Sequence, residues 1–290
     1  LKDIALVTEN EEQVLITLGQ GEKTEYDRSE TFINLFVRQA KLTPNNTAVV
    51  FRDRLLTYKE LDELTTRLAV HLQHEYDVKP ETIVGVMIER SEWMVIYPIA
   101  VMKAGGAYMP LDYTFPSERL KFMCEDAGVN LILSEGTKVS DALPDFTGRV
   151  LTTEEAINLP PTSYTLDITR RASAGNAMVV LYTSGTTGMP KGVILEYGGI
   201  VNFCYWYTDE FDVTEQDRSL AYANFGFDAH MMDIYPALSK GASVYIISDK
   251  MRMDLDAMNT YMNEQGINLA FMTTQVGCIF ASGQIENRSL

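Results

Sequence analysis

The sequence predicts an α/β fold with mostly parallel sheets that are covered by helices on both faces. Short runs rich in valine, isoleucine and leucine alternate with longer segments of helical periodicity. Such runs are apolar along their whole length, as in TIVGVMI at Thr82–Ile88, which is typical of strands buried on both faces. Strands that alternate with helices in this way form parallel sheets.

The first expected elements lie before residue 80. Residues 1–29 are polar and irregular, apart from a short apolar helix expected around Val14–Leu18. Thr57 and Glu60 then have the spacing of a capping box, which predicts the start of a helix. Leucines follow it at helical spacing, so one face of this helix should be buried. They are Leu61, Leu64, Leu68 and Leu72.

The rest of the chain continues the alternation. Strands are expected at Thr82–Ile88, Val129–Leu133, Met178–Tyr182, Ser243–Ile247 and Leu269–Met272. Helices are expected at Glu92–Lys103, Ser117–Ala127, Gly198–Tyr207 and Leu255–Gln265. Gly266 should end the last of these helices.

The charge balance argues against nucleic acid as a partner. The 290 residues contain 24 Lys and Arg against 40 Asp and Glu, a net charge of −16. Non-specific nucleic-acid binding needs cations that neutralise phosphates. The N-terminus has no signal-peptide pattern, and the longest apolar stretch, Trp93–Met102, is about half a membrane-spanning helix. We expect a soluble cytoplasmic protein without a membrane partner.

Cysteine and histidine offer little material for a metal site. Cys124, Cys204 and Cys278 form no CxxC pair, and each is expected to pack as a small apolar residue. His71 and His74 share a helix, but no third ligand stands nearby, which favours a surface position. No metal ligand is predicted.

The most informative segment is the run TSGTTGMPKG from Thr183 to Gly192. It holds four hydroxyls, three glycines and one lysine directly after an apolar strand. Glycines let backbone N–H groups face an anion, hydroxyls add donors, and Lys191 supplies a positive charge. The segment predicts a polyphosphate cradle. A Walker loop does not fit, because Pro190 and Gly192 occupy two of its required positions.

This segment resembles the phosphate loop of the adenylate-forming enzymes, and the chain is similar to an adenylation domain of a nonribosomal peptide synthetase. LTYKEL at Leu56–Leu61 resembles the family's LTYxEL motif. Met102–Asp112 and Pro116–Arg119 together resemble LKAGxAYVPLD…PxxR, and Phe227–Ala229 stands at the FDxS motif. The flanking motifs themselves are expected to serve packing and turn geometry.

The resemblance covers about residues 30–290, which would form the N-terminal portion of the adenylation core. Residues 1–29 resemble the linker that joins a condensation domain to an adenylation domain. The family's adenine- and magnesium-binding segment, ribose-binding Asp and C-terminal domain with the catalytic lysine would follow Leu290. We therefore expect an incomplete core that is inactive alone, with no catalytic residue assigned within it.

The resemblance implies ATP-dependent activation of an amino acid as its aminoacyl-adenylate, with release of pyrophosphate. The product would then load onto a phosphopantetheine thiol of a carrier-protein domain, with a condensation domain in the same synthetase. The phosphate loop would hold the β- and γ-phosphates of ATP in the presence of Mg²⁺. Its implied phosphate-binding residues are Thr183, Ser184, Gly185, Thr186, Thr187, Gly188 and Lys191.

The matching Asp of the family pairs with the α-amino group of the substrate, which implies that role for Asp228. Ala229, Met232 and Phe271 match positions that line the substrate pocket. They are apolar, which predicts a hydrophobic, branched aliphatic substrate such as leucine. Met232 and Phe271 could equally be ordinary core residues.

Two positions depart from the family. Tyr197 stands where a His often follows the phosphate loop, and His230 stands where Ser is usual. Adenylation needs no general base, because the substrate carboxylate is already ionised at pH 7. We expect His230 to position or line the pocket, while a titrating histidine remains the alternative.

Two other functions stay open at this point. One is an acyl- or aryl-CoA ligase of the same superfamily, against which Asp228 and the condensation-type linker both count. The other is a non-catalytic scaffold module, which would have no need for the loop from Thr183 to Gly192.

Overall fold

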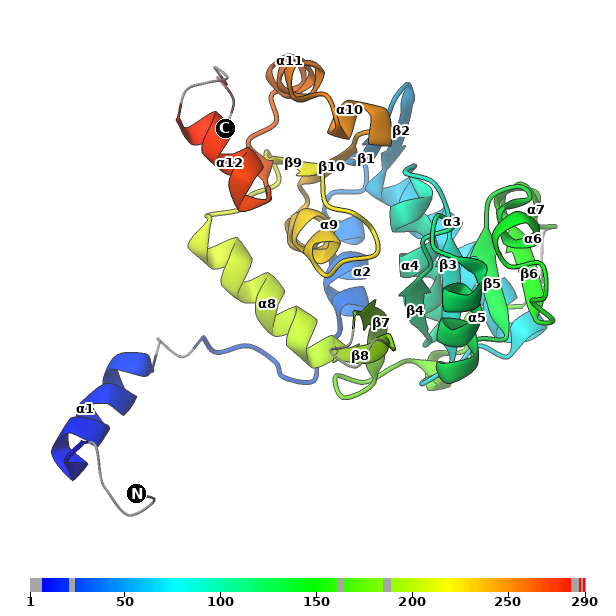
Figure 1. The fold of residues 1–290 in the computed structure, drawn as a ribbon, viewed down its shortest axis with the longest axis horizontal. Coiled ribbons are helices and arrows are strands. Elements are labelled where there is room, and N and C mark those ends of the chain that lie inside the picture. The colour runs from blue at the N-terminus through cyan, green and yellow to red at the C-terminus, as the bar shows by residue number, and fades with distance from the viewer. Residues whose placement is uncertain are drawn as a thin grey trace.

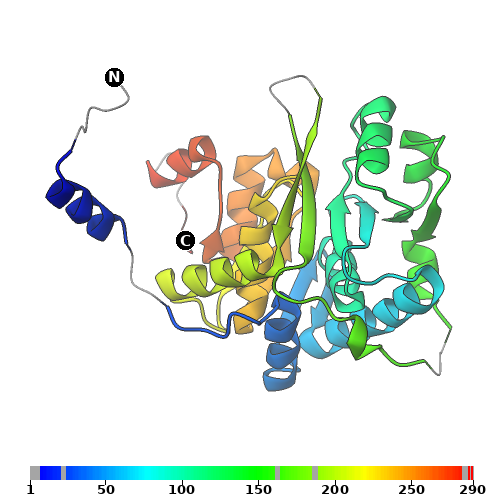
Figure 2. The same ribbon diagram turned by 90° about the horizontal axis from the view of Figure 1, so that it is seen from below.

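The computed structural model describes residues 7–20, 24–160, 164–184, 189–282, 287 and 289. Its elements form two sheets with helices between and around them (Figure 1). The view turned by 90° shows the same body from below, with one hairpin projecting from it (Figure 2). Helix α1 (Glu9–Gly19) has no buried residue and stands apart from this body.

The larger sheet contains six strands among the described residues, in the order β6-β5-β3-β4-β7-β8. The neighbouring strands pair in parallel except β7 and β8, which form an antiparallel hairpin at one edge. The strands are β3 (Ile83–Met87), β4 (Ala107–Pro110), β5 (Leu131–Ser134), β6 (Arg149–Thr152), β7 (Ala177–Thr183) and β8 (Lys191–Glu196).

The smaller sheet has five strands within the described chain, in the order β11-β9-β10-β1-β2. Here the β1–β2 pair is antiparallel and the others are parallel. The strands are β1 (Thr47–Phe51), β2 (Arg54–Thr57), β9 (Arg218–Ala221), β10 (Ser243–Ile246) and β11 (Leu269–Ala270). The prediction of mostly parallel sheets in an α/β fold is confirmed.

The helices follow the expected alternation. Thr57 and Glu60 form the predicted capping box at the start of α3, with the Thr57 N–H donating to Glu60 over 2.9 Å. Gly266 ends α11 in the left-handed conformation, as expected. The helices after α1 are α2 (Phe32–Leu42), α3 (Tyr58–Tyr76), α4 (Trp93–Ala104), α5 (Ser117–Asp126), α6 (Lys138–Ala142), α7 (Thr153–Ile157), α8 (Tyr197–Glu210), α9 (Ala229–Lys240), α10 (Asp249–Arg252), α11 (Leu255–Gln265) and α12 (Thr274–Ala281), with a 3₁₀ turn at Ile168–Arg170.

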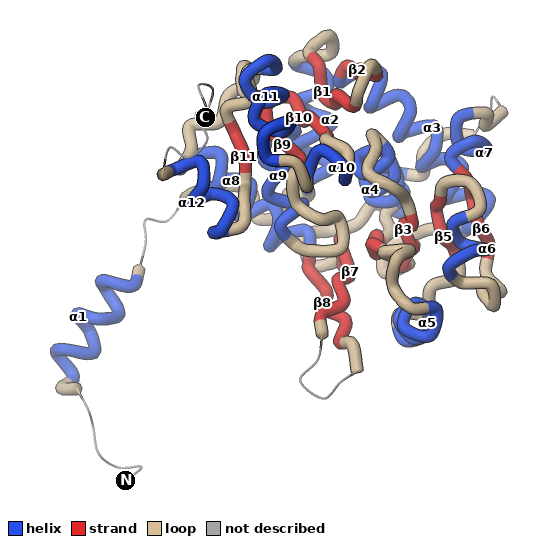
Figure 3. Tube along the Cα trace, turned by 45° about the horizontal axis from the view of Figure 1, so that its top comes forward, coloured by secondary structure: helices blue, strands red, loops and turns tan. Residues whose placement is uncertain are grey.

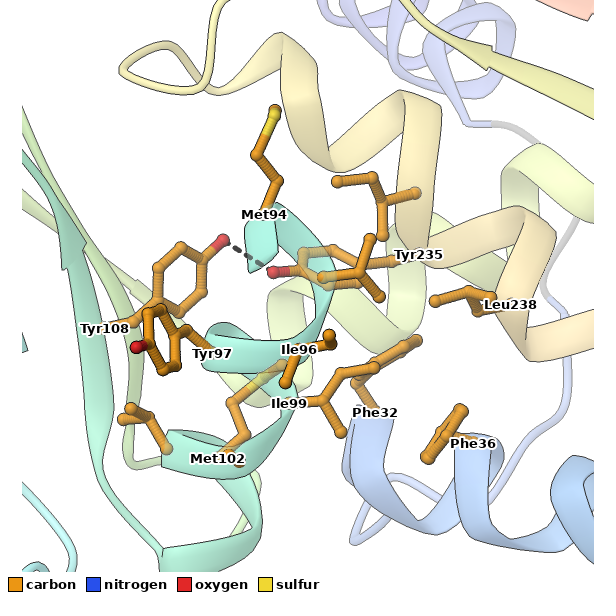
Figure 4. Close-up of a cluster of buried hydrophobic side chains, with 14 of the residues drawn as sticks. Phe32, Phe36, Met94, Ile96, Tyr97, Ile99, Met102, Tyr108, Tyr235 and Leu238 are labelled. Carbon is orange, nitrogen blue, oxygen red and sulfur yellow. Dashed lines mark hydrogen bonds between the residues drawn. The ribbon is translucent and has the colours of Figure 1, made fainter. Parts of the chain in front are cut away.

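The main core lies where α2, α4 and α9 meet the two sheets (Figure 3). Every residue of α4 is buried, including Lys103, whose ammonium donates to Asp62 and Thr66. Figure 4 shows aromatic residues of three elements packed around this helix: Phe32 from α2, Tyr108 from β4 and Tyr235 from α9. The core thus joins the smaller sheet to the larger one.

One packing prediction is wrong. Cys124 and Cys204 are buried as expected, but Cys278 is exposed on α12. Val276 and Phe280 are the residues of this helix that pack against the adjacent apolar cluster. Residues one turn apart share a helix face, so Cys278, midway between them, points the other way.

Candidate functional site

The predicted substrate aspartate lies in a tight turn between β9 and α9. The Asn224 side chain accepts from the Gly226 N–H over 2.8 Å, and the Phe227 N–H donates to the Asn224 carbonyl over 3.1 Å. Asp228 occupies the position before the first helical residue, yet within the described chain its side chain makes no capping hydrogen bond. Its carboxylate is exposed and therefore available to a ligand.

A buried arginine holds the chain that leads into this turn. Arg90 follows β3, and its guanidinium donates to three carbonyl groups. These belong to Ala221, the last residue of β9, to Ala223 just after it, and to Ile247, which follows β10. Burial lowers the pKa of Arg90 to about 10, so it remains a cation at pH 7. Arg90 thereby ties the larger sheet to the ends of two strands of the smaller one.

A buried carboxyl group holds the same segment from the other side. Asp233 Oδ2 on α9 accepts from the Ala223 N–H over 2.8 Å. Burial raises the pKa of Asp233 to about 8, so the group is mostly protonated at pH 7. Its Oδ1 has no hydrogen-bond partner among the described residues. Ala223 is thus fixed at both its N–H and its carbonyl group.

His230 supports the turn at its last peptide. The ring is 1% exposed, with Nδ1 against the Phe227 carbonyl and Nε2 at 2.6 Å from the Tyr108 hydroxyl. Burial lowers the pKa of His230 to about 4, so the ring is neutral at pH 7.

The predicted pocket-lining residues lie at one edge of the smaller sheet. Ala229 and Met232 are half-buried in the first turns of α9. Phe271 directly follows β11, which pairs in parallel with β9 through Ala270 and Leu220. The carboxyl ends of adjacent parallel strands are where α/β proteins bind ligands. Phe271 follows the carboxyl end of β11, and the Asp228 turn follows the carboxyl end of β9.

The residues predicted to form a phosphate loop begin and end on the hairpin of β7 and β8, which projects from the body (Figure 2). Thr183 and Lys191 face each other at the end of the ladder, and Thr183, Ser184 and Lys191 are exposed. The predicted residues Gly185, Thr186, Thr187 and Gly188 lie outside the described residues.

A cavity of about 210 Å³ opens beside the Asp228 turn, where strand ends of both sheets converge. Arg90 follows β3, Pro110 ends β4, Asn224 follows β9, and Asp249 follows β10. Its lining among the described residues does not include Asp228 or the three predicted pocket residues.

Two residues that support the turn, Arg90 and Asp233, were not predicted from the sequence. Asp233 had a signal, because it is a charged residue within the apolar run MMDIYPAL. Arg90 had none, because it stands in the polar run ERSE between two apolar segments. Fully buried charged side chains are rare unless they are paired.

The described residues contain neither a metal-binding cluster nor a membrane-spanning helix. No group of three or more His, Cys, Asp or Glu side chains is placed there to hold a metal ion. Likewise, none of the helices in that part of the chain has the length and apolarity needed to cross a bilayer.

Comparison with known proteins identifies the class that this fold and site define. A family model described as "AMP-binding enzyme" matches residues 36–286, and the chain belongs to this family. Over 290 residues it is 35% identical to bacitracin synthase 1 of Bacillus licheniformis, covering all of this chain and 5% of that protein. Over 255 residues it is 36% identical to tyrocidine synthase 1 of Brevibacillus parabrevis, covering 87% and 23%.

Solved structures agree with this relationship. A nonribosomal peptide synthetase, FmoA3, superposes with a TM-score of 0.79 at 27% identity, covering 90% of this chain and 27% of that one. The N-terminal subdomain of Klebsiella oxytoca NpsA superposes with a TM-score of 0.76 at 26% identity, covering 88% and 63%. The chain therefore matches adenylation-domain structures, and it spans a small part of the curated synthetases.

Proposed function

We propose that the protein activates an amino acid by adenylation for nonribosomal peptide synthesis. A carboxylate oxygen of the amino acid would attack the α-phosphorus of ATP. The bond from that phosphorus to the bridging oxygen would break, and pyrophosphate would leave. Both reactants are anions, so holding them together and neutralising charge are the main tasks of such a site.

The observation that carries this proposal is the free carboxylate of Asp228. An aspartate at a helix start commonly caps the helix, but this side chain does not. Instead, Arg90, Asp233 and His230 support the backbone around it from buried positions. A fixed carboxylate suits an ion pair with the α-ammonium group of an amino acid. It would disfavour acids that lack the amine, because its charge would then lose its partner.

The exposed residues of the hairpin would bind ATP. The hydroxyls of Thr183 and Ser184 can donate to phosphate oxygens, and the Lys191 ammonium can offset phosphate charge. Gly185, Thr186, Thr187 and Gly188 would complete this set. A magnesium ion would accompany ATP, and we assign no step to a metal held by this chain alone.

The finer points of the proposal concern the substrate side chain and the partner. Ala229, Met232 and Phe271 offer apolar surface, which supports a hydrophobic, branched aliphatic amino acid.

The adenylate would pass to the phosphopantetheine thiol of a carrier-protein domain. A similar solved structure is titled an adenylation–PCP di-domain fusion, which supports this partner. We also propose residues 1–29 as the linker to a condensation domain, and a cytoplasmic location.

Amino-acid-dependent ATP–pyrophosphate exchange tests the function. The assay would use the protein in its full natural length, with each of the twenty amino acids and with 4-methylpentanoate, the des-amino analogue of leucine. We expect exchange with one aliphatic amino acid and little with the analogue. Exchange with 4-methylpentanoate or an aryl acid instead would favour a CoA ligase, and ATP binding without exchange would favour a scaffold module.

A further inference from the structure

A buried chain of hydrogen bonds ends on the peptide that joins Phe227 to Asp228. The Tyr235 hydroxyl donates to the Tyr108 hydroxyl over 2.6 Å, the bond drawn in Figure 4. The Tyr108 hydroxyl lies 2.6 Å from His230 Nε2, and His230 Nδ1 contacts the Phe227 carbonyl. Both tyrosine rings and the imidazole are buried. The chain therefore supports the Asp228 turn from inside the core.

The chemistry of these groups fixes the direction of the chain. A carbonyl oxygen can only accept, so His230 Nδ1 carries the proton and donates to Phe227. In the neutral ring Nε2 then accepts from the Tyr108 hydroxyl, whose oxygen accepts from Tyr235. Every donor in this network points toward the Asp228 turn. The proton positions of the two hydroxyls and of the imidazole ring are therefore all determined by the Phe227 carbonyl acceptor.

Tyr108, an inner member of this chain of hydrogen bonds, lies on a strand that pairs with the one leading to the predicted phosphate loop. Tyr108 lies on β4, in register with Val179 of β7. Strand β7 continues to Thr183 and the loop. A hydrogen bond from Tyr108 to α9 thus connects the two halves of the proposed site, one in each sheet.

We propose that His230 is a positioning residue that couples the Asp228 turn to the β4–β7 strand pair, so that the amino-acid carboxylate meets the α-phosphate in line. This role rests on the adenylation function proposed above. Small errors in the alignment of two reactants cost large factors in rate, and buried hydrogen-bond networks fix such alignments. A serine at this position would be too short to reach both Tyr108 and Phe227.

The two ring nitrogens have separable tasks, which makes the role testable. In His230→Asn the amide nitrogen can take the place of Nδ1 and keep the bond to Phe227, while the contact with Tyr108 is lost. In His230→Gln the longer amide can reach Tyr108, while the bond to Phe227 is lost. Tyr108→Phe removes the Tyr108 bond from the other side and changes the core by one hydroxyl.

Exchange kinetics of the full-length protein would separate these tasks. For His230→Gln we expect the amino-acid KM to rise about tenfold, because one buried hydrogen bond of the turn is lost. For His230→Asn and Tyr108→Phe we expect kcat to fall about tenfold with the amino-acid KM within about twofold of the original. The KM for ATP should not change in any of them.

Tyr97→Phe is the matched control. Tyr97 is equally buried, and its hydroxyl donates to the Ser134 carbonyl on β5, away from α9. It should lower Tm without changing kcat or KM. If Tyr108→Phe and His230→Asn behave like this control, His230 is a packing residue and the proposal is overturned.

The tautomer gives a readout that does not depend on activity. In ¹⁵N NMR at pH 7, His230 should show a protonated Nδ1 and an unprotonated Nε2, and a protonated Nε2 would overturn the chain of bonds. Exchange by the unmodified protein tests the wider function separately. Its absence with every acid would overturn that function and this role with it, whereas exchange with unaltered variants overturns this role alone.

Discussion

The Asp228 turn and the β7–β8 hairpin support their proposed ligands in opposite ways. The turn is supported by three buried polar side chains: Arg90 after β3, and His230 and Asp233 on α9. In the hairpin, β7 pairs with β4 of the body, whereas β8 is held by its ladder with β7 and is mostly exposed to solvent. One half of the proposed site is built into the core, and the other projects from it.

Because of this difference, we expect substitutions in the two regions to affect folding and ligand binding differently. Around the turn, the supporting groups are buried, so changing them should affect folding and ligand binding together. On the hairpin, the functional groups and much of their surroundings are exposed, so their loss should affect ligand binding with little effect on folding. Asp228 itself combines both cases, since an exposed carboxylate stands on a buried support.

The largest effect is expected for Asp228→Ala. Truncating one partner of an ion pair in a binding pocket costs about 2–5 kcal/mol, so preference for the amino acid over its des-amino analogue should fall by about 30-fold or more. Because the carboxylate makes no capping bond, Tm should stay within about 1 °C. The measurement is kcat/KM for both acids in the exchange assay, and an unchanged preference would exclude Asp228 as the amine-binding group.

Asp233→Asn should change the pH dependence of stability. The folded-state pKa of Asp233, about 8, lies above its ordinary value of 3.8, so folding retains a proton that the unfolded chain releases between these values. That stabilisation is complete below pH 3.8 and is lost as the pH rises through 8, with a slope of at most about 1.4 kcal/mol per pH unit. Arg90 lies nearby and keeps the folded-state pKa of Asp233 below the value that burial alone would give.

The Asn variant should lack this slope while keeping an acceptor for the Ala223 N–H. The measurement is urea unfolding of both proteins at pH 5, 6, 7 and 8. As the pH rises, the free energy of unfolding of the variant should increase relative to that of the original protein. Parallel curves for the two proteins would mean that Asp233 is ionised in the folded state, and that the support of the turn is an ion pair.

The sequence predicted the fold class, and its candidate ligand-binding residues stay a prediction, but it did not reveal the buried side chains that support the Asp228 turn. Apolar runs and caps are local signals, so the start of α3 and both ends of α11 were predicted correctly. The short β9, with the sequence RSLA, has no β-branched residue and was not predicted. Helix α9 was not predicted either, since its buried His230 and Asp233 interrupt the apolar pattern. The bonds Tyr108–His230 and Arg90–Ala223 join residues 122 and 133 positions apart. No periodicity of one segment can reveal such pairs.

Lys191→Ala tests the role of the exposed β7–β8 hairpin in binding ATP. Loss of one cation that contacts phosphate should raise the KM for ATP about tenfold, equivalent to ~1.4 kcal/mol, with the amino-acid KM nearly unchanged. Because Lys191 is exposed at the first position of β8, the unfolding transition should not move. Lys250→Ala, an exposed lysine of α10, is the control that should leave both KM values as they are. An unaltered ATP requirement would contradict the assignment of the phosphate loop.

The smallest effect is expected for Ile194→Thr on β8, and its cross-strand partner is the matched control. Ile194 is 58% exposed and pairs with Val180 of β7, which is 3% exposed. Replacing Ile194 should change the free energy of unfolding by less than about 0.5 kcal/mol, as for most surface positions. Val180→Thr places a hydroxyl in the core of the same hairpin and should cost about 1–3 kcal/mol. Urea unfolding measures both. A cost above about 1 kcal/mol for Ile194→Thr would mean that the outer strand is packed in solution, and the contrast between a core-built turn and a projecting hairpin would no longer hold.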